Sequence, residues 1–455
     1  MYLAGIDIGT TTICGVLFHT GTLQVDAVAV RDNKFVSPDP GDRARCQDPV
    51  YIEAAVLSII EELTVFAEAK GVAVGALSLT SQMHGILYLD AAGNALSNYY
   101  TWQNQQGLEV FYGETVEARV SRILGQPVFT GYGTVTYLYH KLTGGIPERA
   151  VRMCGIADYI AMRLIGSTVP VSDITITASL GLLNNASRSI NSRVFDIDGL
   201  KPEFLPELAD SSVILGSFQS VPVVLPMADN QAGFIGSLKQ LDEAFLITYG
   251  TSSQLSFYGR TLAHYPGFEV RPFPGEGYLY VHSSLGGGNS YQLMAEFFRD
   301  TLQLFGCEQE KNLYKMMDTF ELDFNTNEII CTPLFRGDRG SDNVTASFGH
   351  ITAANFTPEN MIKSLVQGMV GELHQFYEVL PAEVKAARSG VVGSGNGVRK
   401  NRHLRRVIEL MYTRPLRITE STEESSLGAA INAGVGIGVF SDYAEGALQV
   451  VKYQE

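Results

Sequence analysis

The chain has 455 residues, 45% of them hydrophobic, which is enough for about two to three domains with buried cores. Its formal net charge of -15, from 48 acidic and 33 basic residues, argues against a surface that binds nucleic acid or an anionic membrane. The five cysteines are scattered and form no CxxC pair, which is typical of reduced thiols rather than of a disulfide framework or a zinc site.

The N-terminal residues lack the basic region and the uninterrupted apolar run of a signal peptide. No segment of the chain is long and apolar enough to span a bilayer. The sequence therefore predicts a cytoplasmic protein with neither a membrane nor a nucleic acid as its partner.

The first predicted element is a strand, a tight turn and a second strand over residues 3–18. Apolar residues alternate with period two before Asp7 and after Thr12, and Gly9 leaves room for the turn. The N–H groups of residues 9–12 can receive an anion, and Asp7 precedes them where a carboxylate can hold Mg²⁺ through water. An ordinary hairpin with a polar turn explains the stretch equally well.

Helical spacing of apolar residues predicts a helix over residues 50–70, and a short buried strand follows over residues 74–80. This strand delivers Gln82, Met83 and His84 to its carboxyl end, where functional residues gather in α/β sheets. A structural histidine is the alternative interpretation of His84. The alternation of strand and helix favours an α/β fold.

The only tryptophan, Trp102, lies among amide side chains. An indole ring can cover the apolar face of a sugar, while amides such as that of Asn104 bind the sugar's hydroxyl groups. A core tryptophan beside a surface loop is the alternative. Farther along, helices are predicted over residues 109–124 and 155–164, and residues 171–177 are polar and strand-like.

A second focal point begins with a strand over residues 221–227, which ends in Ala-Asp-Asn-Gln at residues 228–231. Residues 244–257 then repeat the opening pattern of strand, polar glycine turn and strand. The two turns, at residues 9–12 and 250–253, lie about half a chain apart. A duplicated α/β domain that faces its twin across a cleft would show this pattern, and its two hairpin tips could hold one polyphosphate from both sides.

The second half continues with helices predicted over residues 291–305, 357–380 and 401–412. A strand that begins at Gly390 runs into a glycine-rich turn before the last of these helices. The final predicted helix, over residues 427–435, is rich in alanine and glycine, which suits close packing against a neighbour.

Together these segments resemble the FGGY carbohydrate kinases of the sugar-kinase, Hsp70 and actin superfamily. The resemblance rests on GIDIGTTT, SQMHG, TWQN, ADNQA ahead of ITYGTSS, VVGSGNG and the closing ESTEESSLGAAINAG, in that order over nearly the whole chain. Within the family, QMHG followed by YTWQ and TGYGT is most similar to sedoheptulokinase, and the xylulose kinases are the nearest alternative.

The resemblance implies an α/β fold of two ribonuclease-H-like domains, with ATP and the sugar in a central cleft. It implies a sugar-binding domain over residues 1–236, with the catalytic aspartate near its end, and a nucleotide-binding domain over residues 237–455. The implied reaction is ATP-dependent phosphorylation of a ketose at a terminal hydroxyl, first of all of sedoheptulose to sedoheptulose 7-phosphate, with Mg²⁺ as cofactor.

The resemblance also assigns roles to individual residues. Asp229 matches the catalytic base, and Asp7 and Asp229 match the acids that organise magnesium. The sugar-contacting positions are Gln82, Met83, His84, Trp102, Asn104 and Gln231. The two phosphate loops are matched by Gly9, Thr10, Thr11, Thr12, Gly250, Thr251 and Ser252, and the adenosine-binding turn by Gly393, Ser394 and Asn396.

These roles agree with the chemistry of phosphoryl transfer, which needs in-line placement and neutralised charge more than covalent help. Three places depart from the family's pattern: Ala228 stands where many relatives have glycine, and Asn104 stands where the tryptophan element usually reaches an aspartate. Tyr139 and His140 stand where relatives often have a tryptophan before the helix end. Asn104 keeps an acceptor oxygen but loses the charge, so xylulose, ribulose, gluconate and glycerol stay open as substrates.

Two other classes of function remain as hypotheses at this point. One is a catalytically silent sugar or nucleotide sensor, because a fold does not fix a function. The other is an actin-like or chaperone-like ATPase that binds a protein partner. The composition permits either a monomer or a homodimer.

Overall fold

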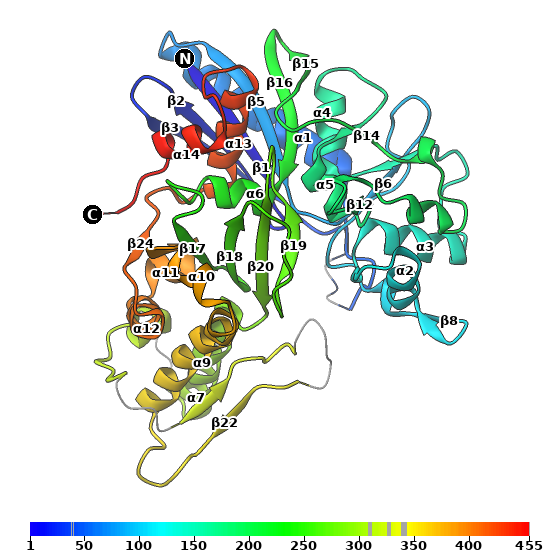
Figure 1. Cartoon of the computed structure of the whole chain (residues 1–455). Coiled ribbons are helices and arrows are strands. Elements are labelled where there is room, and N and C mark those ends of the chain that lie inside the picture. Colours follow the sequence, from blue (N-terminus) through cyan, green and yellow to red (C-terminus); the bar gives the residue numbers. More distant parts are fainter. Residues whose placement is uncertain (38, 40, 308–311, 325–328, 338–343, 455) are drawn as a thin grey trace.

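The computed structural model describes residues 1–37, 39, 41–307, 312–324, 329–337 and 344–454. The described residues form two lobes, each built around a six-stranded sheet with helices on its faces (Figure 1). The predicted α/β class is thus confirmed, and the two lobes are the physical counterpart of the repeat in the sequence.

The first sheet begins with the predicted N-terminal hairpin. In order across the sheet, its strands are β15 (Ile214–Phe218), β16 (Val221–Ala228), β5 (Val74–Ser81), β1 (Tyr2–Ile8), β2 (Thr12–His19) and β3 (Gln24–Asp32). Strands β1, β2 and β3 form an antiparallel meander, and β5 and β16 extend the sheet parallel to β1. The carboxyl ends of β1, β5 and β16 therefore lie side by side.

The second sheet repeats this plan. Its strands, in order, are β19 (Glu269–Pro272), β20 (Tyr278–Ser284), β18 (Ser253–Gly259), β17 (Ala244–Tyr249), β23 (Gly390–Ser394) and β24 (Leu416–Ile418). Strands β17, β18 and β20 form the meander, and β23 and β24 run parallel to β17. The turns at residues 9–12 and 250–253 consequently occupy equivalent places in the two lobes.

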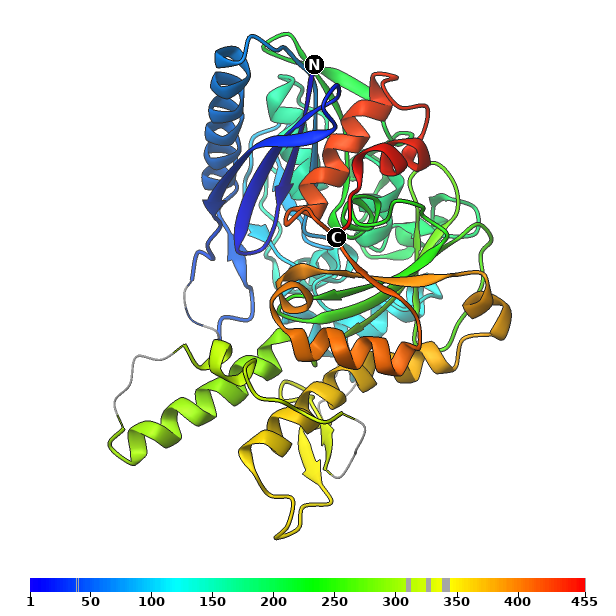
Figure 2. The same ribbon diagram turned by 90° about the vertical axis from the view of Figure 1, so that its left-hand side faces the viewer.

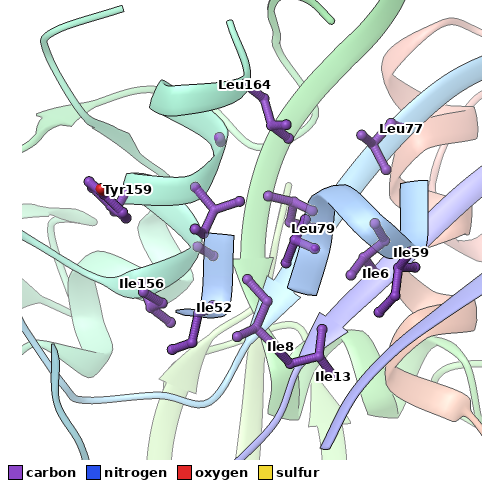
Figure 3. Close-up of a cluster of buried hydrophobic side chains, with 14 of the residues drawn as sticks. Ile6, Ile8, Ile13, Ile52, Ile59, Leu77, Leu79, Ile156, Tyr159 and Leu164 are labelled. Carbon is purple, nitrogen blue, oxygen red and sulfur yellow. The ribbon is translucent and has the colours of Figure 1, made fainter. Parts of the chain in front are cut away.

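One face of the first sheet is covered by α1 (Pro49–Ala69). The helix begins where the Asp48 side chain accepts a hydrogen bond from the N–H of Val50. Its buried stripe includes Ile52 and Ile59, which pack with sheet residues such as Ile6 in one apolar cluster (Figure 3). Each fully buried aliphatic side chain of this kind stabilises the fold by about 1.5–3 kcal/mol.

The opposite face of the first sheet is covered by α13 (Glu424–Gly436), which comes from the far end of the chain (Figure 2). A Cβ atom on Gly5 would lie 2.0 Å from the carbonyl oxygen of Ser426, so strand and helix touch backbone to backbone. The predicted division into residues 1–236 and 237–455 stays a prediction, because α13 belongs to the second range but packs in the first lobe.

The remaining elements fill out the two lobes. Between β5 and β16 lie the helices α2 (Val116–Leu124), α3 (Gly133–Thr143), α4 (Ile156–Leu164) and α5 (Ile174–Ser179), the 3₁₀ turns Gln106–Leu108, Ser192–Asp196 and Pro202–Phe204, and the short strands β6 (Leu87–Leu89), β7 (Tyr99–Tyr100), β8 (Val110–Phe111), β9 (Glu114–Thr115), β10 (Arg152–Cys154), β11 (Val171–Ser172), β12 (Leu183–Asn184), β13 (Ser189–Ile190) and β14 (Glu207–Leu208). Strand β4 (Cys46–Gln47) pairs with β7. The second lobe adds α7 (Gly288–Leu304), α8 (Leu313–Met317), β21 (Ile330–Thr332), β22 (Ser347–Gly349), α9 (Pro358–Glu378), α10 (Ala382–Ala386), α11 (Gly395–Lys400) and α12 (Arg402–Tyr412). Helices α6 (Asp229–Ile235) and α14 (Tyr443–Val450) pack against α13.

Two predicted elements were wrong in type. Residues 109–124 are not one helix, because a hairpin of β8 and β9 precedes α2; Tyr112 and Gly113, with φ of 57° and 87°, turn the chain there. Residues 171–177 are not a strand, because β11 ends at Ser172 and a short helix, α5, follows.

The cap of α5 explains the second error. The Asp173 side chain accepts hydrogen bonds from the N–H groups of Thr175 and Ile176 at 2.9 Å each. This satisfies two of the donors that a helix start leaves unpaired and draws the chain into a helical turn.

All five cysteines are free thiols, as predicted. Over the ranges that the structure describes, no helix has the length and apolarity to cross a bilayer.

Candidate active site

Three of the predicted site residues lie at the carboxyl ends of parallel strands in the first sheet. Asp7 is near the end of β1, Gln82 follows β5, and Asp229 follows β16. The register pairs Ile8 with Ser81, and Ser81 with Ala228, so the three strand ends are level. Sites of α/β proteins usually form at such an edge, and here it gathers residues that are far apart in the sequence.

Asp229 is the first residue of α6 and lies near a second carboxylate. Burial raises the pKa of Asp229 to about 6, against the opposing influence of Arg271 and the N–H of Asn230. Burial, and then the charges of Asp229 and Glu423, raise the pKa of Asp7 well above its usual range. The carboxyl groups of Asp7 and Asp229 are therefore near enough for one charge to disfavour the other.

Arg271 reaches this point from β19 of the second lobe. Arg271 is only 7% exposed, and its Nη2 donates a hydrogen bond to Glu269 Oε2 at 2.7 Å. Its Nη1 lies 3.7 Å from the sulfur of Met83 in the first lobe. Arg271 thus bridges the lobes and places a positive charge by Asp229. An arginine on an edge strand carries no motif, so sequence reasoning had no signal for it.

The first hairpin tip is held by a chain of hydrogen bonds. Trp102 Nε1 donates to Thr10 Oγ1 at 2.9 Å, and Thr10 Oγ1 donates to Gln82 Oε1 at 3.2 Å. Gln82 Nε2 donates to Gln47 Oε1 at 2.7 Å, and Gln47 Nε2 donates to the carbonyl of Thr10 at 2.7 Å. Thr10, Gln82 and Trp102, which were predicted separately, thus form one hydrogen-bonded group. Gln47 is its fourth member, and no motif around Gln47 in the sequence indicated this role.

The second hairpin tip is adjoined by two glycine-rich turns. A Cβ atom on Gly287 would lie 2.3 Å from the carbonyl carbon of Ser252. A Cβ atom on Gly395, whose φ is 82°, would lie 2.6 Å from the carbonyl oxygen of Tyr249. The three turns are therefore in close backbone contact, and glycine turns of this kind can form sites for the oxygens of a phosphate. The turn at residues 286–288 was given no role, although three glycines after a strand are a readable signal.

One hydrogen bond joins the two lobes beside the aspartate. Asn230 Nδ2 donates to Gln254 Oε1 at 2.8 Å. Asn230 follows Asp229 directly, and Gln254 follows the turn at residues 250–253 on β18. Asp229 therefore lies within one residue of a contact with the second hairpin, while its neighbour Asp7 belongs to the first.

A second group of residues forms next to Met83. His84 has a left-handed backbone with φ of 76°, and its Nδ1 lies 2.7 Å from the carbonyl oxygen of Ser179, to which it donates. The His84 ring stacks on Tyr132, with centroids 4.2 Å apart. Gly131 makes this possible, because a Cβ atom there would lie 2.2 Å from the carbonyl oxygen of Trp102. The sequence predicted His84 but assigned no role to Tyr132.

Two predicted sugar contacts are not brought into these groups. Asn104 is 1% exposed, and its Nδ2 donates to Gln106 Oε1 at 3.0 Å. Gln231 is fully buried, and its Nε2 donates to the carbonyl oxygen of Pro272 at 2.8 Å. Both amides hold parts of the protein in place, so their contact with a sugar stays a prediction.

The surroundings of Asp7 fit a magnesium ion. Its Oδ1 atom is buried and has no hydrogen-bond partner among the described residues. Within those residues, no three His, Cys, Asp or Glu side chains come together as a metal site. Mg²⁺ commonly takes one or two carboxylates, with water and substrate phosphates as its other ligands, so a site of few protein ligands is what this ion requires.

Fold and site together define a class of protein. Two lobes of like topology each present a polar hairpin tip, and the half-buried Asp229 directly precedes a residue that contacts the other lobe. This is the actin-like two-domain fold.

The chain belongs to the FGGY family of carbohydrate kinases, whose N-terminal domain matches residues 2–236. It is 22% identical over 479 residues to a xylulose kinase of Lactococcus lactis, covering 100% of this chain and 91% of that protein. It is 22% identical over 466 residues to a gluconokinase of Bacillus subtilis, covering 94% and 86%. The protein is accordingly a sugar kinase.

The solved structure of ligand-bound xylulose kinase from Lactobacillus acidophilus has the same fold. Its TM-score is 0.84 at 21% identity, and the alignment covers 100% of this chain and 93% of that one. Recognition of the family from its motifs is thereby confirmed, whereas the choice of sedoheptulose as the substrate stays a prediction.

Proposed function

We propose that this kinase transfers the γ-phosphate of ATP to a terminal hydroxyl of a ketose, with sedoheptulose as the first candidate and Asp229 as the general base. The observation that carries the proposal is that Asp229 follows β16 level with the end of β1, which carries Asp7, and directly precedes Asn230, whose side chain contacts Gln254 of the second lobe. This is where an acceptor hydroxyl has to meet a phosphate that both lobes hold.

In this mechanism, Asp229 accepts the proton of the acceptor hydroxyl as its oxygen attacks the γ-phosphate. Backbone N–H groups of residues 9–12 and of Thr251 and Ser252 hold the phosphate oxygens and stabilise the charge of the transition state. Asp7 and Asp229 would hold Mg²⁺, and the bound ion would supply further neutralisation of the phosphate charge. The nucleoside is placed at the turn of Gly393, Ser394 and Asn396, whose strand ends level with Thr248 of β17.

The sugar is placed against Gln82, Met83, His84 and Trp102. The support for this is their closeness in the structure: Gln82 and Trp102 share Thr10 as a hydrogen-bond partner, and Met83 precedes the stacked ring of His84. We keep residues 1–236 as the sugar-binding domain and residues 237–455 as the nucleotide-binding domain.

Xylulose is the second candidate substrate, because relatives that match over the whole chain are named xylulose kinases. The deciding experiment is a coupled assay of ADP release with ketoses of five to seven carbons, polyols and aldonates. We expect the highest kcat/KM with sedoheptulose. A higher value with xylulose would move the assignment to that sugar, and ATP binding without ADP release from any sugar would indicate a silent sensor.

We also infer a reducing, cytoplasmic location and either a monomer or a homodimer. The five free thiols support the first inference, since none of them is paired. Size-exclusion chromatography with light scattering measures the second directly.

Replacement of His84 by asparagine is expected to raise the KM for the sugar about tenfold, with little change in the KM for ATP. The variant removes the ring that stacks on Tyr132, and asparagine tolerates the left-handed backbone at this position. Steady-state kinetics with each substrate varied in turn measures the effect. An equal rise in both KM values would contradict a role confined to the sugar.

The rate is expected to fall in acid as Asp229 takes up a proton. Because burial raises its pKa to about 6, log kcat/KM for the sugar is expected to drop with a slope near one below pH 6 and to be level above it. A pH series from 5 to 8 at saturating ATP measures this. A profile that stays level down to pH 5 would argue against Asp229 as the base.

A further inference from the structure

Two buried side chains, those of Thr175 and Asp173, lie next to the end of β16, the strand that leads into Asp229. The N–H of Ala228, the last residue of β16, donates to Thr175 Oγ1 at 2.9 Å. Thr175 Oγ1 in turn donates to Asp173 Oδ1 at 2.7 Å. Asp173 and Thr175 are fully buried, and Ala228 is 1% exposed. The peptide between Met227 and Ala228, one residue before Asp229, is therefore held by a side chain of α5.

This hydrogen bond replaces one that the sheet does not supply. The outer strand β15 pairs with β16 only as far as Val224. The N–H of Leu225, which donates to the carbonyl of Val213, makes the last backbone hydrogen bond on that side of β16. Pro226 has no N–H, and the register with β5 shifts between Val224 and Met227. At Ala228 one side of β16 has thus lost its neighbouring strand, and the Thr175 hydroxyl takes its place.

Asp173 fixes the direction of that hydroxyl. Its Oδ1 accepts from the N–H groups of Thr175 and Ile176 and from the Thr175 hydroxyl, and its Oδ2 accepts from Ser211 Oγ at 3.0 Å. A hydroxyl group that donates to Asp173 can offer only its lone pairs to Ala228. The carboxylate thereby sets Thr175 as an acceptor for the backbone beside the base.

We propose that Thr175 and Asp173 are positioning residues for phosphoryl transfer: through the N–H of Ala228, they fix the point at which β16 ends and Asp229 begins α6. Neither residue touches the substrates. The inference rests on the proposed role of Asp229 as the base. Without the Thr175 hydroxyl, the end of β16 moves, and the carboxylate no longer meets the acceptor hydroxyl in line.

The test compares Thr175→Val with Thr175→Ser, and with Thr177→Val as the matched control. Thr177 lies two residues after Thr175 on the same short helix and is 1% exposed, but its Oγ1 has no hydrogen-bond partner among the described residues. Thr175→Val is expected to lower kcat about 10- to 100-fold while both KM values stay within about threefold. Thr175→Ser, which keeps the hydroxyl, restores the rate, and Thr177→Val leaves it unchanged.

Thr175→Val and Thr175→Ser differ in their methyl groups as well as in the hydroxyl. Thr175→Ala is therefore compared with Thr175→Ser, because these two side chains differ only in the hydroxyl. Circular dichroism and thermal unfolding show which variants are folded. A folded Thr175→Val or Thr175→Ala enzyme with wild-type kcat would overturn the proposal. So would a Thr177→Val enzyme that is equally slow, or failure of both hydroxyl-free Thr175 variants to fold while the Thr177 variant folds.

Asp229→Asn is assayed in the same series. If that variant turns over normally, the proposed function fails and takes this inference with it. If it is inactive while Thr175→Val is as fast as the wild type, the base assignment stands and only the positioning role is lost.

Discussion

Replacement of Asp229 by asparagine is expected to lower kcat by roughly 10²- to 10⁴-fold, the range by which a positioned base accelerates a reaction. Asparagine keeps the size of the side chain but cannot take up the proton of the acceptor hydroxyl. Because Asp229 is not the main binding group for either substrate, the KM values are expected to change little. Measurement of ADP release with saturating sugar and ATP gives the result.

Asp158→Asn is the matched control for this variant. Asp158 is a fully buried aspartate on α4, and burial raises its pKa well above the usual range. Its replacement by a neutral amide of equal size is expected to leave kcat near the wild-type value. Equal activity of the two variants would remove the carboxylate of Asp229 from the mechanism.

The Asp229→Asn variant is expected to unfold at a higher temperature than the wild type above pH 6. Burial raises the pKa of Asp229 to about 6 in the folded state, whereas in the unfolded chain it ionises near 3.8. The folded state therefore holds the proton more tightly, and the stability that this gives is present below pH 4 and lost as the pH rises through 6. Asparagine has no charge to bury, so the difference from wild type is absent below pH 4, grows between pH 4 and pH 6, and is complete above pH 6.

The strands and their turns could be predicted because their signals are local. The period-two alternation around Asp7 and the glycine turns at residues 9–12 and 250–253 predicted both hairpins, and their repetition predicted two like sheets. The end of a buried strand likewise indicated Gln82 and Asp229, because the carboxyl ends of parallel strands share one edge.

The errors have physical causes that a local pattern does not contain. Residues 171–177 are rich in β-branched side chains, which favour a strand, but the Asp173 cap and the burial of Thr175 favour a helical turn. Arg271 and Gln47 meet the site only through tertiary contacts. No pattern in either neighbourhood indicates which distant residue a side chain will reach.

Replacement of Gly428 by alanine is expected to destabilise the protein by about 3 kcal/mol or more. Gly428 lies in α13 against α6, and a Cβ atom there would stand 1.9 Å from the carbonyl oxygen of Ala232 and 2.5 Å from its carbonyl carbon. These are backbone atoms, which cannot swing aside, so the two helices have to separate. Since Asp229 begins α6, kcat is expected to fall together with the melting temperature.

Gly371→Ala isolates this contact from the general effect of a methyl group in a helix. Gly371 lies inside α9, and a Cβ atom there has nothing within 4 Å. Alanine is the better helix former by about 1 kcal/mol, so this variant is expected to melt at the same or a higher temperature, with normal kcat. If Gly428→Ala were equally stable, the backbone contact between α13 and α6 could not be as close as the structure places it. Helix α13 would then not determine the position of Asp229.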